Sequence, residues 1–278
     1  MKKWLFWLGM WLALAPAGWS QGLFTFKRTE DVIYGRKFGT ALTLDVIQPA
    51  KPNGLGVIWV ISSAWVSSHE AISPHGYQPL LDRGYTIFAV VPGSSPKFFA
   101  PEMVEDVHRA VRFVRHNAAK YGIDPARLGI TGTSAGGHLA LLIATRGGPG
   151  KTNATDVVDR ESSAVQAAAC FYPVTDWAEF THVDKRDEKA LQMARELSSV
   201  NYLTDKTPPI LIIHGDADQR VPIQQSQAFA KRAQEVGATM KLIVRPGLGH
   251  GWPKLGEDQS LFADWFDQYL RGKTPVEK

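Results

Sequence analysis

Residues 127–144 read RLGITGTSAGGHLALLIA, and this stretch indicates the fold. Its apolar pattern predicts a strand over Arg127–Thr131 and a helix over Ala135–Ala144, joined by the sharp turn Gly132-Thr133-Ser134-Ala135-Gly136. A serine hydroxyl is a weak nucleophile that must be exposed where a base can reach it, and such a turn exposes it. The two glycines of the turn let strand and helix approach closely, and the helix N-terminus favours negative charge nearby. We therefore predict that Ser134 is a nucleophile rather than part of a glycine-rich packing turn.

Outward from this turn, apolar runs alternate with segments of helical period from residue 55 to the end. For example, apolar residues spaced three and four apart predict a helix over residues 101–121. This alternation favours one α/β domain with a mostly parallel central sheet and helices on both faces. We expect further strands at Leu55–Ile61, Tyr85–Val91, Val165–Tyr172, Ile210–His214 and Met240–Val244, and further helices at Tyr77–Arg83, Gln224–Val236 and Leu261–Leu270.

Two segments depart from the alternation. Glu30–Tyr34 and Ala41–Ile47 look like two strands joined by a Gly-containing turn, which predicts an N-terminal antiparallel hairpin at one sheet edge. Residues 174–208 are polar and charged, with a helical piece near Lys189–Leu197. We interpret them as a small lid-like insertion over the C-terminal edge of the sheet, not as a second domain.

The partners that a serine nucleophile needs follow it in the chain. Asp218 lies in a loop just beyond the strand Ile210–His214, and Asp216 is a rival that we interpret as a loop-fixing carboxylate. His250 follows the last strand in a loop flanked by glycines, which lets its ring reach across the sheet edge. We predict that His250 removes the Ser134 proton and returns it to the leaving group, while Asp218 fixes the imidazole tautomer.

The chain from about residue 30 to residue 270 resembles the α/β-hydrolase family, in particular its carboxylesterase, lipase and carbohydrate-esterase members. The resemblance is carried by Leu42–Val46, Tyr121–Pro125, Gly132–His138, His214–Pro222 and Gly249-His250. It implies a serine esterase that cleaves carboxylic esters through an acyl-enzyme on Ser134, with acetyl or feruloyl esters of polysaccharide as candidate substrates. No metal and no organic cofactor are expected.

The loop after the strand Leu55–Ile61 departs from the family pattern. Such enzymes usually have His-Gly-Gly-Gly there, whereas this chain has Ile61-Ser62-Ser63-Ala64. A residue here that requires a positive φ would incur a steric cost. Backbone N–H groups survive the substitution, so we predict an oxyanion hole formed by the N–H groups of Ala135, Ser63 and Ala64.

Three tryptophans, Trp65, Trp177 and Trp252, lie in loops expected at the same edge of the sheet. Aromatic side chains suit the stacking of sugar rings or aromatic acyl groups. We propose them as substrate-binding residues, with ordinary loop packing as the alternative for each.

The first 20 residues differ in composition from the rest. They hold Lys2 and Lys3, an apolar run over Trp4–Ala15, and then Pro16 and small residues. This order predicts a signal peptide over residues 1–20 and one domain over residues 21–278, exported to the periplasm or the outside. The apolar run is shorter than the ~20 residues of a membrane span, so we expect no stable membrane insertion after cleavage. An uncleaved anchor is the alternative.

Charge and cysteine content exclude other classes of protein. The formal charge is +4, of which the two lysines of the leader supply half, and the chain has no basic run or stripe, so we expect no nucleic-acid partner. The single cysteine, Cys170, allows no intrachain disulfide and lies in an apolar run, where a buried inert thiol is expected.

Two short motifs resemble known sites without matching them. Gly147–Thr152 lacks the first glycine of a phosphate loop. His69 and His75 are six residues apart, unlike the histidines of the zinc-protease motif H-E-x-x-H.

Two other functions remain open from the sequence. One is an exported serine peptidase of the prolyl-oligopeptidase type, which shares the fold and the order of the triad. The other is a non-catalytic binding protein that keeps the hydrolase fold, which the altered oxyanion loop favours. The sequence does not give the oligomeric state.

Overall fold

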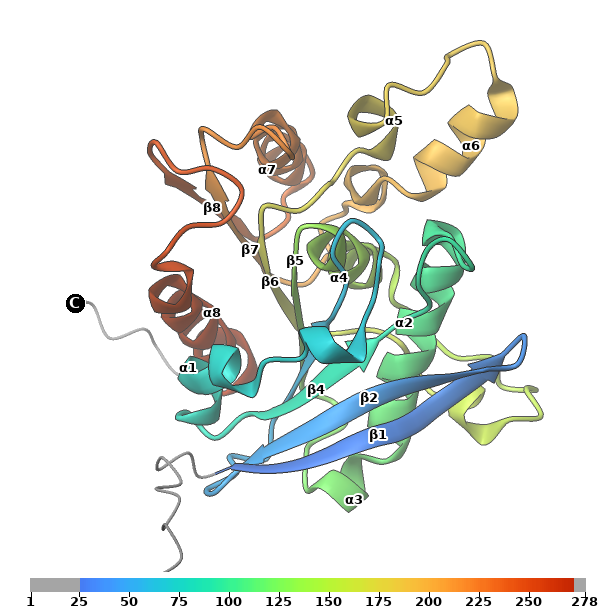
Figure 1. The fold of residues 1–278 in the computed structure, drawn as a ribbon, viewed down its shortest axis with the longest axis vertical. Coiled ribbons are helices and arrows are strands. Elements are labelled where there is room, and N and C mark those ends of the chain that lie inside the picture. Colours follow the sequence, from blue (N-terminus) through green and yellow to red (C-terminus); the bar gives the residue numbers. More distant parts are fainter. Residues whose placement is uncertain (1–25, 273–278) are drawn as a thin grey trace, which may run out of the picture.

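The computed structural model describes residues 26–272, and its centre is one eight-stranded sheet (Figure 1). The strand order is β1-β2-β4-β3-β5-β6-β7-β8, with β1 antiparallel to β2, β2 antiparallel to β4, and every other neighbouring pair parallel. The predicted fold class, including the N-terminal hairpin at one edge, is confirmed. The predicted signal segment lies outside the described residues. The strands are β1 (Phe26–Lys37), β2 (Thr40–Pro49), β3 (Gly56–Val60), β4 (Thr86–Val91), β5 (Leu128–Thr133), β6 (Ala167–Phe171), β7 (Ile210–Gly215) and β8 (Met240–Arg245).

Helices cover both faces of the sheet, so its central strands are buried on two sides. In β3, Ile58 packs with α2 and α4, whereas its neighbour Trp59 packs with α1 and α8, which is why this strand is apolar throughout. No helix within residues 26–272 is both long and apolar enough to cross a membrane. The helices are α1 (Gln78–Leu81), α2 (Ala100–His116), α3 (Ala118–Tyr121), α4 (Ala135–Arg146), α5 (Trp177–Phe180), α6 (Glu188–Glu196), α7 (Gln224–Val236) and α8 (Leu255–Leu270).

Two helices differ most from the sequence prediction. The helix predicted over residues 101–121 is divided at Asn117, whose φ of −96° and ψ of +15° leave the helical region and end α2. Helix α8 begins at Leu255, six residues before its predicted start, because Glu257 and Asp258 in its first turn favour a helix N-terminus without contributing to the apolar pattern.

The insertion predicted over residues 174–208 contains α5 and α6, which project beyond the C-terminal edge of the sheet (Figure 1). Its two ends are joined, since the backbone N–H of Trp177 donates to the Ser198 hydroxyl at 2.8 Å. The first end is also tied to α7, where Gln225 accepts from the Thr175 N–H at 2.8 Å and from the Thr175 hydroxyl at 2.7 Å. The stem of the insertion is therefore fixed to the body of the protein.

Candidate active site

Ser134 lies between the end of β5 and the start of α4, with φ of +52° and ψ of −119°. This conformation is costly for a residue with a side chain, and such strain persists only where surrounding contacts impose it. Here the Ser134 N–H donates to the Phe171 carbonyl at 3.0 Å, which extends the pairing of β5 with β6 beyond the strand. The turn is so tight that a Cβ on Gly132 would collide with the backbone of Gly136. The glycines of the motif therefore permit the turn that exposes the serine.

The structure brings the three residues of the predicted triad into hydrogen-bond contact. His250 Nε2 lies 2.9 Å from Ser134 Oγ, and His250 Nδ1 lies 2.7 Å from Asp218 Oδ2. A carboxylate only accepts, so Nδ1 carries the proton and Nε2 is left to accept the serine proton. This is the geometry of a nucleophile, a base and an orienting carboxylate.

Asp218 is held more firmly than a pairing with His250 alone requires. Its side chain is fully buried, and Oδ1 accepts from the N–H groups of Arg220 at 2.8 Å and Val221 at 3.0 Å. His214 Nε2 lies 3.2 Å from Oδ2 and 2.9 Å from the Val221 carbonyl, while its Nδ1 lies 2.7 Å from the Ser226 hydroxyl. Both neighbours of Nε2 are acceptors, so Nε2 carries the proton, and burial lowers the pKa of His214 and keeps it neutral. Asp218 thus faces four N–H donors, which fix its orientation toward His250.

Tyr172 also belongs to the site, although the sequence reasoning gave it no role. It follows β6 directly, has a φ of +35°, and its ring centroid lies 4.4 Å from that of His250. Burial, with a smaller effect of the nearby Asp218 charge, raises the pKa of Tyr172 to about 12, so its hydroxyl stays protonated. The ring supports one face of the imidazole. The signal available in the sequence was its place just past the carboxyl end of a parallel strand, where functional residues gather.

The altered oxyanion loop forms a tight turn over Ser63–Val66. Its two central residues, Ala64 and Trp65, have φ of +48° and +58°, so the steric cost expected of this glycine-free loop does occur. The Ser63 N–H donates to the Val66 carbonyl at 2.9 Å, which engages one of the three predicted oxyanion donors within the turn. The N–H groups of Ala64 and Ala135 make no hydrogen bond to any residue within 26–272. These two remain available to a developing oxyanion.

A pocket of about 240 Å³ contains Ser134 and His250. Residues 62–65, Tyr172 and Phe180 form its walls, together with Arg220 and Val221. Of the three predicted substrate-binding tryptophans, Trp65 lines this pocket. The other two lie outside it: Trp177 packs against Trp65 with ring centroids 4.6 Å apart, and Trp252 packs on Tyr172 while its indole N–H donates to Asp258 at 2.9 Å.

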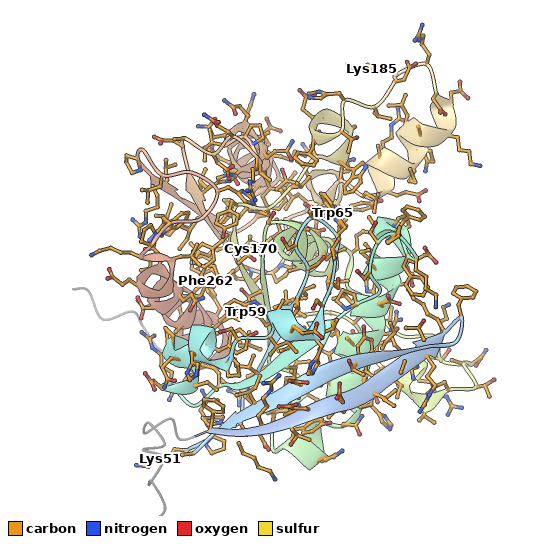
Figure 2. All side chains as sticks on the ribbon, viewed as in Figure 1. Lys51, Trp59, Trp65, Cys170, Lys185 and Phe262 are labelled. Carbon is orange, nitrogen blue, oxygen red and sulfur yellow. The ribbon has the colours of Figure 1, made fainter. Side chains whose placement is uncertain are left out.

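A second, apolar pocket of about 580 Å³ adjoins the first. It lies between the start of α2 and the insertion, with Phe99, Met103, Trp177 and Met193 among its lining residues. Ala64 and Trp65 line both pockets, so the turn that carries Trp65 forms their common wall. In Figure 2, Trp65 lies between the body of the protein and the helices of the insertion.

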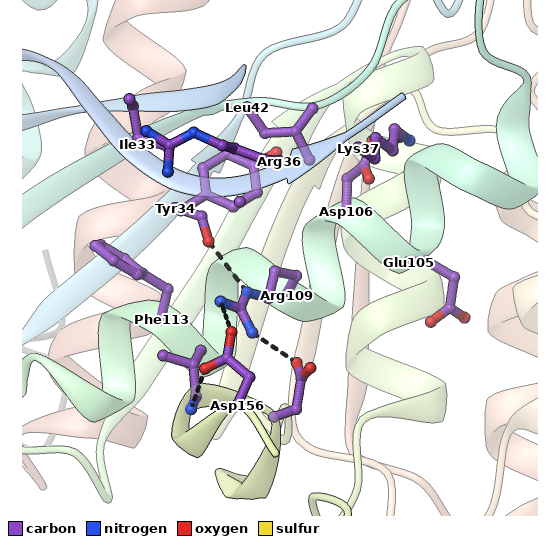
Figure 3. Close-up of a pocket in the computed structure, with 13 residues that line it drawn as sticks. Ile33, Tyr34, Arg36, Lys37, Leu42, Glu105, Asp106, Arg109, Phe113 and Asp156 are labelled. Atoms are coloured by element: carbon purple, nitrogen blue, oxygen red, sulfur yellow. Dashed lines mark hydrogen bonds and ion pairs between the residues drawn. The ribbon is translucent and has the colours of Figure 1, made fainter. Parts of the chain in front are cut away.

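A third pocket, of about 500 Å³, lies away from the triad between β1 and α2 and shares no lining residue with the catalytic pocket (Figure 3). The Arg109 guanidinium in it pairs with Asp156 at 2.6 Å and Asp159 at 2.9 Å, and Lys37 pairs with Asp106 at 2.6 Å. These cations are already neutralised by the protein, and this pocket holds no arrangement of nucleophile and base.

Three potential metal ligands lie close together: Asp31 on β1, Asp45 on β2, and His69. Asp45 is fully buried, accepts from Arg28 Nε at 2.6 Å, and lies 2.8 Å from His69 Nε2. The cationic Arg28 thus already neutralises the buried carboxylate, and the residues do not fit a metal ion.

The single cysteine, Cys170, lies in the core on β6. Burial raises the pKa of its thiol, as expected for an inert core cysteine.

Comparisons with known proteins place the chain in a family. The model of the BD-FAE family matches residues 44–233. Esterase LipQ of Mycobacterium tuberculosis is 31% identical over 215 residues, which cover 70% of this chain and 50% of LipQ, so the chain spans about half the length of that relative.

Solved structures match over more of their own length. A truncated carbohydrate esterase from gut microbiota superimposes with a TM-score of 0.76 at 28% identity, over 89% of this chain and 98% of that one. An acetyl ester-xyloside bifunctional hydrolase from Caldicellulosiruptor lactoaceticus gives 0.70 at 26% identity, over 85% and 92% of the two chains. The family model spans more than half of this chain, and the solved structures share its fold. The chain therefore belongs to the BD-FAE family of α/β-hydrolases.

Proposed function

We propose that this protein is a serine esterase that hydrolyses carboxylic esters through an acyl-enzyme on Ser134. The observation that carries the proposal is the unbroken chain of hydrogen bonds from Ser134 through His250 to Asp218. Similarity to proteins named as esterases and carbohydrate esterases supports the same chemistry.

The geometry supplies each step of the reaction. His250 Nε2 accepts the Ser134 proton as Oγ attacks the ester carbonyl, and the N–H groups of Ala64 and Ala135 stabilise the oxyanion of the tetrahedral intermediate. When this intermediate collapses, the C–O bond to the alcohol breaks and His250 gives its proton to the departing oxygen. Water, deprotonated by His250, then attacks the acyl-enzyme, and Ser134 regains its proton on release of the acid.

The size of the catalytic pocket narrows the proposed substrates. A volume of about 240 Å³ suits a short acyl group such as acetyl and leaves little room for a long chain. We therefore favour acetyl esters of sugars or plant polysaccharide, with feruloyl esters as the bulkier candidates. Export by the predicted signal peptide would place the protein with a polymeric substrate outside the cell. Mass spectrometry of the N-terminus of the secreted protein would test whether this signal peptide is cleaved.

Turnover of aryl acetates provides the test of the chemistry. The wild type should hydrolyse 4-nitrophenyl acetate and be labelled covalently by an organophosphonate, whereas Ser134→Ala should do neither. Release of acetate from acetylated xylan, of ferulate from feruloylated arabinoxylan and of the anilide from a prolyl substrate would rank the substrate classes. A folded wild type that is neither labelled nor active on any ester would overturn the proposal.

A further inference from the structure

His138 lies one helical turn after the nucleophile and is fully buried, yet the triad gives it no role. Both of its ring nitrogens have partners: Nδ1 lies 3.1 Å from Trp65 Nε1, and Nε2 lies 2.7 Å from the Leu197 carbonyl. An indole N–H only donates and a carbonyl only accepts, so His138 accepts at Nδ1 and donates from Nε2. Burial lowers its pKa to about 4, which keeps this neutral tautomer at neutral pH.

The Trp65 side chain that bonds to His138 belongs to the strained turn. Ala64 and Trp65 both have positive φ without being glycine, which costs on the order of 1–3 kcal/mol each. Such a conformation persists only if tertiary contacts impose it. The Trp65 carbonyl accepts from the Ser95 N–H at 3.0 Å, and the indole adds its hydrogen bond to His138 and edge-to-face packing on Trp177 with ring centroids 4.6 Å apart.

The same turn carries the Ala64 N–H, one of the two available oxyanion donors. The Ser63–Val66 pairing fixes the ends of the turn, and the Trp65 indole fixes its outer residue against α4. Helix α4 also begins with Ala135, the second donor. One helix thus positions the nucleophile and one donor directly, and the other donor through His138.

We propose that His138 is a positioning residue, which holds the Ser63–Val66 turn through its bond to Trp65 so that the Ala64 N–H can stabilise the oxyanion. The inference rests on the proposed esterase function. The alternative is a structural role, in which His138 only ties α4 to the insertion through the Leu197 carbonyl.

Two substitutions separate these roles because they keep different halves of the imidazole. In His138→Asn, the amide oxygen lies near the position of Nδ1 and can accept from Trp65, whereas the side chain is too short to reach Leu197. In His138→Gln, the amide nitrogen lies near the position of Nε2 and can donate to Leu197. Trp65→Phe keeps an aromatic ring but removes the donor.

Steady-state kinetics on 4-nitrophenyl acetate is the experiment. Deleting one oxyanion donor costs about 10²–10³ in kcat, so a misplaced donor should cost His138→Gln and Trp65→Phe about 10- to 100-fold in kcat, with KM within about threefold. His138→Asn should stay within about threefold of the wild type. The double variant His138→Gln/Trp65→Phe should lose no more than the worse single variant, because both changes break one interaction.

His108→Leu is the matched control. His108 is also a buried histidine whose pKa burial lowers to about 4, and its Nδ1 lies 3.0 Å from the Ser163 hydroxyl, away from the catalytic pocket. This variant should lose stability to heat with no change in kcat. If His138→Gln keeps the wild-type kcat, or if His138→Asn loses as much as His138→Gln, the positioning role is wrong. If the wild type itself hydrolyses no ester, the proposed function fails as well, and that result differs from an active wild type with unaffected variants.

Discussion

Replacing Asp218 by asparagine should abolish most of the activity by changing which nitrogen of His250 carries the proton. The structure leaves the new amide one orientation. The backbone N–H groups of Arg220 and Val221 point at Oδ1 and cannot reverse, whereas at Oδ2 His250 can change its tautomer and His214 keeps its bond to the Val221 carbonyl. The amide oxygen therefore takes the Oδ1 position and the NH₂ group faces His250. His250 Nδ1 then meets a donor in place of an acceptor.

The imidazole responds by carrying its proton on Nε2, where it can no longer accept from Ser134. The same substitution in serine-protease triads lowers kcat about 10⁴-fold, which corresponds to about 5 kcal/mol of transition-state stabilisation. We expect a loss of this size here, because Asp218 is fully buried and no rotation of the amide avoids the clash of donors.

The assay is kcat for 4-nitrophenyl acetate at pH 7.5, with circular dichroism to establish that the variant folds. Asp216→Asn is the control: Asp216 accepts from the Gly247 N–H at 2.6 Å, and an asparagine oxygen can do the same. This control should remain within about threefold of the wild type, as expected for a change that keeps its hydrogen bond. A folded Asp218→Asn that keeps more than a tenth of the wild-type kcat would refute the reasoning from the tautomer.

Three further predictions concern other parts of the protein. Gly136→Ala should lower the free energy of unfolding in urea by about 1–3 kcal/mol or more, because the new Cβ meets the Val60 carbonyl at the end of β3. The control Gly148→Ala should be neutral, since there is open space around Gly148. Equal effects of the two substitutions would count against the clash with Val60. Trp65→Ala removes the side chain that separates the pockets of about 240 and 580 Å³. The kcat/KM for octanoyl esters, divided by that for acetyl esters, should therefore rise at least about tenfold. An unchanged ratio would show that the two pockets stay separate. The hydrogen bond that His69 Nε2 donates to the buried Asp45 carboxylate raises the pKa of His69. The stabilisation from this pair should be fully present below about pH 6.5 and disappear as the pH rises through the folded-state pKa. The stability difference between the wild type and His69→Gln should therefore shrink between pH 5.5 and 8.5, and a constant difference would show that the pairing does not depend on charge.

The sequence predicted the parts of the fold that local pattern determines. The helix Gln224–Val236 has its predicted bounds, because an amphipathic pattern precedes Gly237, which ends it with a φ of +76°. Helix α8 was predicted six residues short, since its polar first turn carries no apolar period. The division at Asn117 escaped prediction because the apolar stripe continues past it, while the backbone of this one residue leaves the helical region.

The candidate site was predicted to the extent that motif and chain order define it. Ser134, Asp218 and His250 each follow a strand, so the parallel sheet brings them to one edge. His138 and Tyr172 were not given roles, because their functions arise from contacts with residues that are distant in the chain. Periodicity says nothing about such contacts.

The fixed stem of the insertion has a consequence for how the site can change in evolution. Residues 181–187, between α5 and α6, form a tip that projects from the body, with Lys185 at its end (Figure 2). Because the stem is closed by the bonds of Trp177 to Ser198 and of Thr175 to Gln225, the length and sequence of the tip can vary without disturbing the triad. Changes at this tip can therefore alter contacts outside the catalytic pocket while the triad keeps its geometry.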